Sequence, residues 1–159
     1  MKYFLIIAVF CTTYLLAQEL KVVADSFNTD QEKGISTFEG NVNIVKKNDE
    51  LNASKVTIYT DDKNQPTKFV AQDNVSFKIL TKEGAKYRGT AGKVIYLPVK
   101  NEYYFYRNVY LQQIDDTKEI RGDEVVLNVV TGKAHAKGLK EEPVIMIFNI
   151  ADDIKKDEK

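Results

Sequence analysis

Cysteine, histidine and tryptophan are nearly absent from the sequence. Cys11 is the only cysteine and His135 the only histidine among 159 residues, and there is no tryptophan. Without a second cysteine the chain cannot build a disulfide framework or a thiolate zinc site. One histidine also excludes a His-rich metal centre and leaves few groups for catalysis. We therefore predict no catalytic residues, no metal and no cofactor, and interpret His135 as a surface strand residue.

No charge of one sign dominates either. The 23 Lys and Arg residues balance 23 Asp and Glu residues, which argues against a nucleic-acid binder, since such proteins show a basic excess. Eight glycines and three prolines are too few for a collagen-like or low-complexity chain. With 43% hydrophobic residues, the length suits one compact domain.

The longest uncharged run lies at the N-terminus, where Lys2 precedes the segment from Tyr3 to Ala17. As a helix this run would span about 22 Å at ~1.5 Å per residue, less than the ~30 Å hydrocarbon core of a bilayer. A basic start, a short apolar stretch and a small final residue are typical of a secretory signal peptide. We predict such a peptide over residues 1–17, cleaved after Ala17. The alternative is a single inner-membrane anchor.

Beyond Gln18, short β-rich runs alternate with polar turns. The runs are rich in Val, Ile, Phe and Tyr, which suit a half-buried pleated surface, and none keeps a helical period. We predict one all-β domain over residues 18–150 and a charged, flexible tail over residues 151–159. The expected strands are Gly40–Val45, Lys55–Thr60, Lys68–Ala71, Val75–Leu80, Lys93–Leu97, Tyr103–Tyr106, Val109–Ile114, Val125–Val130 and Val144–Ile150.

Two short motifs recur along this region. An Asn-Val pair followed by one variable and one apolar residue begins at Asn41, Asn74 and Asn108. The second motif is a small residue followed by two variable positions and then by alternating apolar residues. It occurs as Ala53-Ser54-Lys55-Val56, Ala91-Gly92-Lys93-Val94 and Gly122-Asp123-Glu124-Val125. A repeat of roughly 30 residues that carries two strands indicates stacked β units.

Alternation along the strands assigns their faces. Val42 and Ile44 share a face with Phe38, but Ala53 is out of phase with Val56, so the chain needs a bulge or corner near Ser54. The same change of phase in the alternation occurs between Ile120 and Val125. Repeated corners predict a sheet that rolls over on itself, as a jelly roll or short β-solenoid with a continuous apolar interior.

These motifs, taken in order, resemble those of the LptA/OstA family of lipopolysaccharide-transport proteins. The resemblance covers roughly residues 18–140 and rests on Ala24-Asp25-Ser26, Phe38-Glu39-Gly40-Asn41-Val42, Ala53-Ser54-Lys55-Val56, Asp73-Asn74-Val75, Tyr87-Arg88-Gly89-Thr90-Ala91 and Ile120-Arg121-Gly122-Asp123. It implies an antiparallel β-jelly roll with open ends, located in the periplasm. It also implies head-to-tail stacking between inner- and outer-membrane components of the transport machinery, with the acyl chains of lipopolysaccharide inside the roll.

An apolar lumen would bind lipid without catalytic groups. Burial of a dozen methylenes at about 0.8 kcal/mol each gains on the order of 10 kcal/mol, which can offset the ~4–15 kcal/mol cost of association. The expected lipid-binding residues are Val42, Ile44, Val56, Ile58, Val75, Phe77, Ile79, Val94, Phe105, Val109, Leu111, Val125 and Leu127. If they fill a solid core instead, the protein would be a periplasmic scaffold or a polysaccharide-binding β-solenoid. An enzyme limited to carboxylate chemistry is the third alternative.

Tyrosine is concentrated in one part of the chain. The cluster comprises Tyr87, Tyr96, Tyr103, Tyr104, Tyr106 and Tyr110. Its rings either pack between strands or mark the boundary between an apolar groove and water, where the amphipathic phenol is favoured.

The segment from Pro143 to Ile150 carries no charge, so an exposed strand here would aggregate unless it were paired. One interpretation is that it pairs with the first strand of a second copy, near residues 20–23, and forms a head-to-tail homo-oligomer. The other is that it closes the sheet of its own molecule. The expected interface residues are Leu20, Val22, Val23, Val144, Ile145, Met146, Ile147, Phe148 and Ile150.

Overall fold

The computed structural model describes residues 19–116 and 118–148 and consists of strands and turns. The strands are β1 (Leu20–Val23), β2 (Ser26–Asp30), β3 (Ile35–Lys46), β4 (Asp49–Thr60), β5 (Pro66–Leu80), β6 (Lys86–Leu97), β7 (Glu102–Gln113), β8 (Lys118–Asn128), β9 (Ala134–Lys137) and β10 (Ile145–Ile147). In this part of the chain no helix is long and apolar enough to cross a bilayer. The predicted signal peptide, Ile150 and the predicted tail lie outside the described residues.

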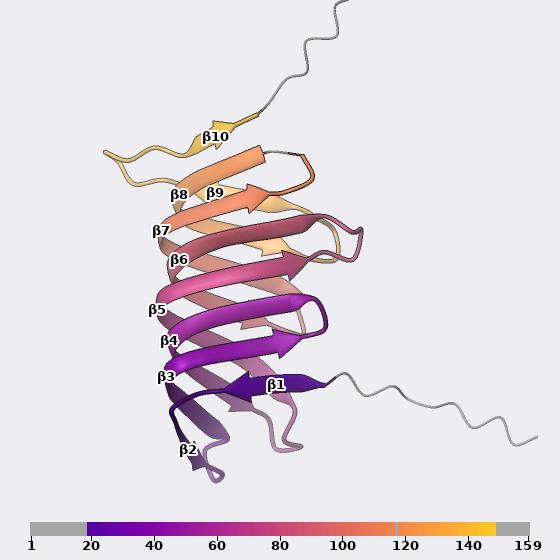
Figure 1. The fold of residues 1–159 in the computed structure, drawn as a ribbon, viewed down its shortest axis with the longest axis vertical. Helices are drawn as coiled ribbons and strands as arrows, with labels where there is room; N and C mark the ends of the chain where they lie inside the picture. Colours follow the sequence, from indigo (N-terminus) through magenta and orange to yellow (C-terminus); the bar gives the residue numbers. More distant parts are fainter. Residues whose placement is uncertain (1–18, 117, 149–159) are drawn as a thin grey trace, which may run out of the picture.

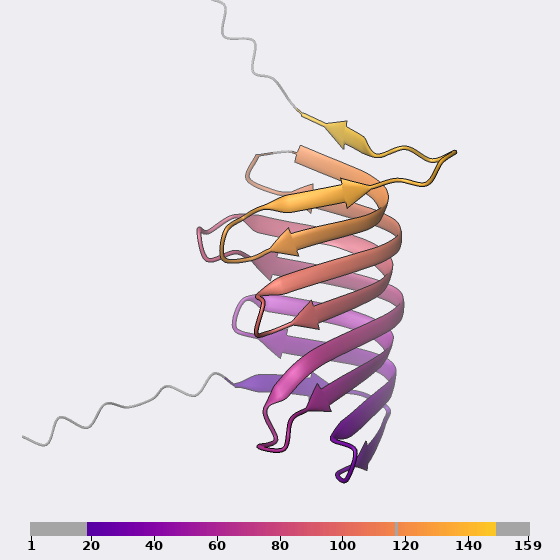
Figure 2. The same cartoon turned by 180° about the vertical axis from the view of Figure 1, so that it is seen from behind.

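All ten strands belong to one antiparallel sheet, in which β3 to β8 follow one another in sequence order. Each of these six long strands bends near its middle, so the sheet folds over into two facing layers (Figure 1). The bends gather at one side of the molecule and the hairpin turns at the other, as the reverse view also shows (Figure 2). This arrangement confirms the predicted antiparallel β-jelly roll.

The short strands complete the two layers at each end of the stack. Residues 43–46 of β3 pair with β1, whereas residues 35–39 pair with β2. At the other end, β8 pairs through residues 119–121 with β10 and through residues 124–127 with β9. The first layer therefore contains β1 and β10, and the second layer contains β2 and β9.

The two repeated motifs form the two sides of each bend. In β3, β5 and β7, the bend consists of two consecutive residues with φ between 45° and 80°: Gly40-Asn41, Asp73-Asn74 and Arg107-Asn108. Each pair lies opposite a single unpaired residue of the next strand, namely Ser54, Gly92 or Asp123. Asparagine tolerates the left-handed conformation better than most residues, which explains its recurrence at this place. The bulge expected near Ser54 and the slip between residues 120 and 125 are confirmed.

Polar contacts hold these bends in place. The Asn41 Nδ2 amide donates to Asp25 Oδ2 at 2.8 Å, and the Asp25 backbone amide donates to the Gly40 carbonyl oxygen at 2.9 Å. Further along, Arg107 Nη2 donates to the carbonyl oxygen of Gly92 at 2.9 Å. The bent side of the stack is thus a ladder of polar contacts, while the apolar residues point between the layers.

The strands are longer than the hydrophobic pattern predicts. The two expected strands at residues 68–71 and 75–80 are the two halves of β5, because the polar bend between them interrupts the pattern without ending the pairing. The pattern misses β2 and β9, whose residues are mostly exposed. The last expected strand is also shorter than predicted, since β10 covers only Ile145–Ile147 among the described residues.

One apolar cluster lies between the two layers. All thirteen residues that alternation assigns to the interior are buried in it, and Phe105, Val125 and Leu127 are completely inaccessible to solvent. Alanines at 53, 71 and 91, the rings of Tyr87 and Tyr103, and Ile120 complete the cluster. The interior predicted from the sequence is therefore correct in position and in composition.

Close packing predicts that Gly89→Ala destabilises the fold. Gly89 lies between Phe77 and Leu111 in the ladder, and a Cβ atom there would come within 2.0 Å of the Tyr110 carbonyl oxygen and 2.8 Å of the Phe77 ring. We expect the free energy of unfolding to fall by about 2 kcal/mol or more in denaturant titrations. The neighbouring exposed variant Thr90→Ala should change it by less than about 0.5 kcal/mol. Equal stability of Gly89→Ala and wild type would contradict the packing described.

Candidate functional site

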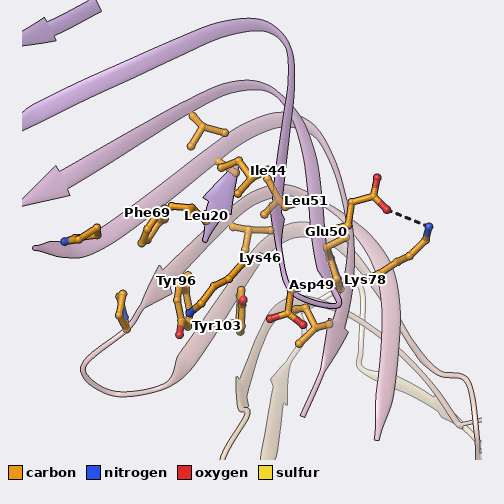
Figure 3. A pocket seen from close by; sticks show the side chains of 17 residues that line it. Leu20, Ile44, Lys46, Asp49, Glu50, Leu51, Phe69, Lys78, Tyr96 and Tyr103 are labelled. Atoms are coloured by element: carbon orange, nitrogen blue, oxygen red, sulfur yellow. Dashed lines mark hydrogen bonds and ion pairs between the residues drawn. The ribbon is translucent and has the colours of Figure 1, made fainter. Parts of the chain in front are cut away.

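A cavity of about 320 Å³ opens between the layers in the N-terminal half of the stack (Figure 3). The fold of the sheet makes this possible, since it places residues from β1, β3, β4 and β5 opposite residues from β5, β6 and β7. The lining consists of Leu20, Ile44, Lys46, Asp49, Glu50, Leu51, Val56, Pro66, Phe69, Ala71, Phe77, Lys78, Ile79, Val94, Tyr96, Pro98 and Tyr103.

The size of the cavity limits what it can hold. An engineered apolar cavity of about 150 Å³ is enough for one benzene molecule, so this cavity accommodates roughly a dozen carbon atoms. Most of its lining is aliphatic or aromatic, and the charged side chains come from the β3–β4 hairpin and Lys78. Such a site suits a single flexible hydrocarbon chain with a polar end at the surface.

Charged groups surround the mouth of the cavity. Lys46 extends toward Tyr96, with its Nζ atom 5.8 Å from the ring centroid (Figure 3). Glu50 and Lys78 border the cavity, but their side chains point to the outer face of the first layer, where Lys78 Nζ lies 3.2 Å from Glu50 Oε2 and lowers the pKa of Glu50 (Figure 3). The mouth is therefore polar while the interior is apolar, as an amphiphile would require.

Asp49 is the carboxylate at this mouth whose pKa is raised. Its Oδ1 atom accepts a hydrogen bond from the Leu80 backbone amide at 2.8 Å. Burial raises the pKa of Asp49, and the Leu80 bond and the nearby Lys46 charge offset that effect only in part. The carboxylate thus contributes a poorly solvated negative charge beside the apolar lining.

An aromatic cluster closes the cavity on the side toward β8. The rings of Tyr96 and Tyr103 stack with centroids 4.4 Å apart. Tyr103 and Phe77, both in the lining, contact Phe105 with centroid separations of 5.9 and 4.5 Å. Burial raises the pKa of Tyr103, so its hydroxyl stays protonated at any physiological pH. Phe105 is completely buried and ends the open volume here.

The predicted lipid-binding residues therefore fall into two groups. Ile44, Val56, Phe77, Ile79 and Val94 line the cavity. The other eight are buried in the packed interior away from the cavity: Val42, Ile58, Val75, Phe105, Val109, Leu111, Val125 and Leu127. The apolar cluster runs along the whole stack, but this cavity occupies only its N-terminal half.

Sequence reasoning did not place several lining residues in the site. Phe69 is in phase with the buried Ala71, so alternation along β5 could have identified it. Leu20, predicted from the sequence only as an interface residue, pairs with Lys46 and also lines the cavity. The charged residues of the mouth carry no hydrophobic signal and become recognisable only when the sheet is folded.

The tyrosine cluster divides between the cavity lining, the core and the outer surface. Tyr96 and Tyr103 lie at the boundary of the cavity. Tyr87 is buried in the core, and its hydroxyl contacts Gln113 Oε1 at 3.2 Å. Tyr104 alternates with buried neighbours and faces outward, where its hydroxyl donates to Glu102 Oε2 at 2.6 Å.

Both edges of the sheet expose apolar side chains. At the C-terminal edge, the residues from Val144 to Phe148 are between 36% and 53% exposed, and β10 pairs only with β8 among the described residues. At the N-terminal edge, Val23 and Phe27 are exposed, and the Phe27 ring lies tilted against that of Phe38 with centroids 4.8 Å apart. Leu20 and Val22 instead turn inward and pack against the core.

The acidic and imidazole side chains form no concentrated site. Within residues 19–116 and 118–148, no three His, Cys, Asp or Glu side chains are grouped as metal ligands would be. His135 lies exposed on β9, which confirms its interpretation as a surface strand residue.

Comparison with known proteins identifies one family and one fold. Residues 21–133 match the family described as "LptA/(LptD N-terminal domain) LPS transport protein". The structure is similar to the crystal structure of LptH, described as the LptA-homologous periplasmic component of the conserved lipopolysaccharide transport device from Pseudomonas aeruginosa, with a TM-score of 0.74. That match covers 84% of this chain and 96% of the other, at 14% identity, so it concerns the fold. No curated protein sequence matched the chain.

The environment of Asp49 predicts that Asp49→Asn stabilises the protein at neutral pH. A raised pKa means that the folded state holds a proton which the unfolded state has already lost, so wild-type stability falls as pH rises above the ordinary value of 3.8. Asparagine does not titrate and can still accept the Leu80 hydrogen bond through its carbonyl oxygen. The variant should therefore unfold at higher denaturant concentration at pH 7, and its advantage should vanish below about pH 4.

The matched control is Asp62→Asn, because Asp62 is exposed in the β4–β5 turn. It should leave stability unchanged at both pH values. If Asp49→Asn showed the same small effect at pH 7 as this control, the buried charge at the mouth would be disproved.

Proposed function

Because the chain belongs to the LptA/(LptD N-terminal domain) family of LPS transport proteins, we propose that it binds lipopolysaccharide and carries it through the periplasm without catalysis. An acyl chain occupies the cavity between the layers, and the saccharide part stays outside the mouth. The observation that carries this proposal is the apolar cavity, open at one side, with charged residues only at its rim.

The energetics support binding without any reaction. A chain of a dozen carbons gains on the order of 10 kcal/mol when its methylenes leave water. The lining is already formed by strands of the folded sheet, so little ordering cost is added on binding. Lys46 at the rim places positive charge where the anionic groups of the lipid would lie.

The exposed edges support a bridge between the membranes. In this proposal, β10 of one copy adds to the N-terminal edge of the next, and the stack reaches inner- and outer-membrane components of the transport machinery. Each edge has unpaired backbone groups on its outer side among the described residues, which is the template that strand addition requires. Residues 1–17 act as the cleaved export signal, residues 18–150 form the carrier domain, and residues 151–159 form its tail.

Site-specific photo-crosslinking tests the cavity. A photoreactive phenylalanine analogue at Phe69, which is half-buried in the lining, should form adducts with lipopolysaccharide in the periplasm. The same analogue at Val70 is the control, because this neighbouring residue faces the opposite side of β5. Adducts at position 69 and not at 70, detected by a mass shift on gels, are the expected result.

Equal labelling at the two positions, or no lipid adduct at either, would count against the carrier. A protein that folds, exports and takes up no lipid at position 69 would instead fit a scaffold with a closed interior.

Self-association is tested by Ile147→Lys. Ile147 is 43% exposed on β10, where it pairs with Glu119. Burial of an unpaired ammonium group in a strand interface should weaken association roughly tenfold, or ~1.4 kcal/mol. Analytical ultracentrifugation would measure this. Val99→Lys adds the same charge at a turn residue that is 85% exposed and far from both edges, and should leave association unchanged. If both variants sediment like wild type, the edge is not the interface.

A further inference from the structure

The side of the molecule where the hairpin turns meet is closed in one half and open in the other. In the C-terminal half, the β5–β6 turn of the first layer reaches the β8–β9 turn of the second. The Lys82 backbone amide donates to the Val129 carbonyl oxygen at 2.9 Å. A Cβ atom placed on Gly132 would lie 3.3 Å from Glu83 Oε2, so the two turns are in contact. We call residues 81–85 and 129–133 the latch.

This contact has no counterpart over the cavity. Among the residues that the structure describes, Lys82–Val129 is the one backbone hydrogen bond that joins the layers along the turn side. Over the cavity, the two layers approach each other through the Lys46 side chain, whose Nζ atom lies 5.8 Å from the centroid of the Tyr96 ring. A long, flexible lysine side chain is easily displaced, whereas the latch fixes two backbone segments.

The interior beneath the latch is full. Leu111, Val125 and Leu127 are at most 1% exposed, and Phe105 separates them from the cavity. Thr81 at one end of the first latch segment is itself 3% exposed, and Ala85 at its other end packs against the core. The open volume therefore stops where the latch begins, and it holds roughly one chain of a dozen carbons.

We propose that the latch sets how many acyl chains the protein admits. When the latch is closed, it confines the ligand to one acyl chain in the N-terminal cavity. When the latch is open, the two layers can separate around Phe105, and the groove then extends to hold a lipid with several acyl chains. This inference rests on the proposed lipid-binding function. One net hydrogen bond shifts an equilibrium only about fivefold, so the closed state is easily opened by a ligand that binds the open state better.

The local geometry allows the hydrogen bond to be removed alone. The Gly84 amide donates to the Thr81 carbonyl oxygen at 3.0 Å, so Lys82 is the second residue of a β-turn. Proline is favoured at that position and has no amide hydrogen. Lys82→Pro should therefore keep the turn and delete the bond to Val129. Lys82→Ala is the matched control, since it removes the exposed charge and keeps the amide.

Binding of two probes by the purified proteins tests the proposal. Lys82→Pro should bind lipopolysaccharide about fivefold more tightly than wild type and Lys82→Ala, because more molecules are open before binding. A fluorescent fatty acid with a single twelve-carbon chain should bind all three proteins equally. If folded Lys82→Pro binds lipopolysaccharide no better than the control, the latch does not limit access and the proposal is overturned.

Amide hydrogen exchange in the wild-type protein decides the question even if the proline variant does not fold. Lipopolysaccharide should accelerate exchange of the Lys82 amide, and the fatty acid should not. If both probes bind and this amide stays equally protected, the latch proposal fails while lipid binding stands. If neither probe binds, the proposed function itself fails.

Discussion

The structure depends on a mismatch in residue number at each bend: two left-handed residues on one strand oppose a single residue on the next. The two-residue side preserves the alternation of faces, so Phe38 and Val42 both point inward. The one-residue side reverses it, so Ala53 and Val56 also both point inward. Without this reversal, half of each even strand would turn its apolar side chains to water. The same local geometry, repeated along the stack, therefore creates the interior and folds one sheet into two layers.

The interior is not uniform along the stack. Strands near the N-terminal end leave space between Phe69 and Leu51, whereas β7 and β8 fill theirs with Phe105, Leu111 and Leu127. Complete burial occurs in both halves, since Val56 and Val94 beside the cavity are at most 1% exposed, as are Leu111 and Leu127 beyond it. In the proposed function, the ligand binds in the half that keeps an open volume. The packed region and the hollow region therefore both belong to one continuous sheet, without a separate domain for either.

Much of this could be predicted from the sequence. Alternation placed all thirteen interior residues correctly, and the phase slip at Ser54 revealed the bends, because both signals are local in the chain. The cavity could not be predicted in this way. Whether Phe77 lines a hollow and Val109 a packed region depends on which side chains meet across the layers. The sequence pattern also misses strands β2 and β9. Polar edge strands are held by backbone pairing, so they carry little hydrophobic pattern.

The terminal strands of the sheet have a mechanical consequence. Each end of the stack carries two short, separate strands, β1 with β2 and β9 with β10, in place of one long bent strand. A neighbouring copy docked on such an end would be held by two separate patches, one on each layer. A rod of many copies would then bend at its joints while every subunit kept its shape. Such a rod could follow changes in the distance between two surfaces without strain on the cavities inside it.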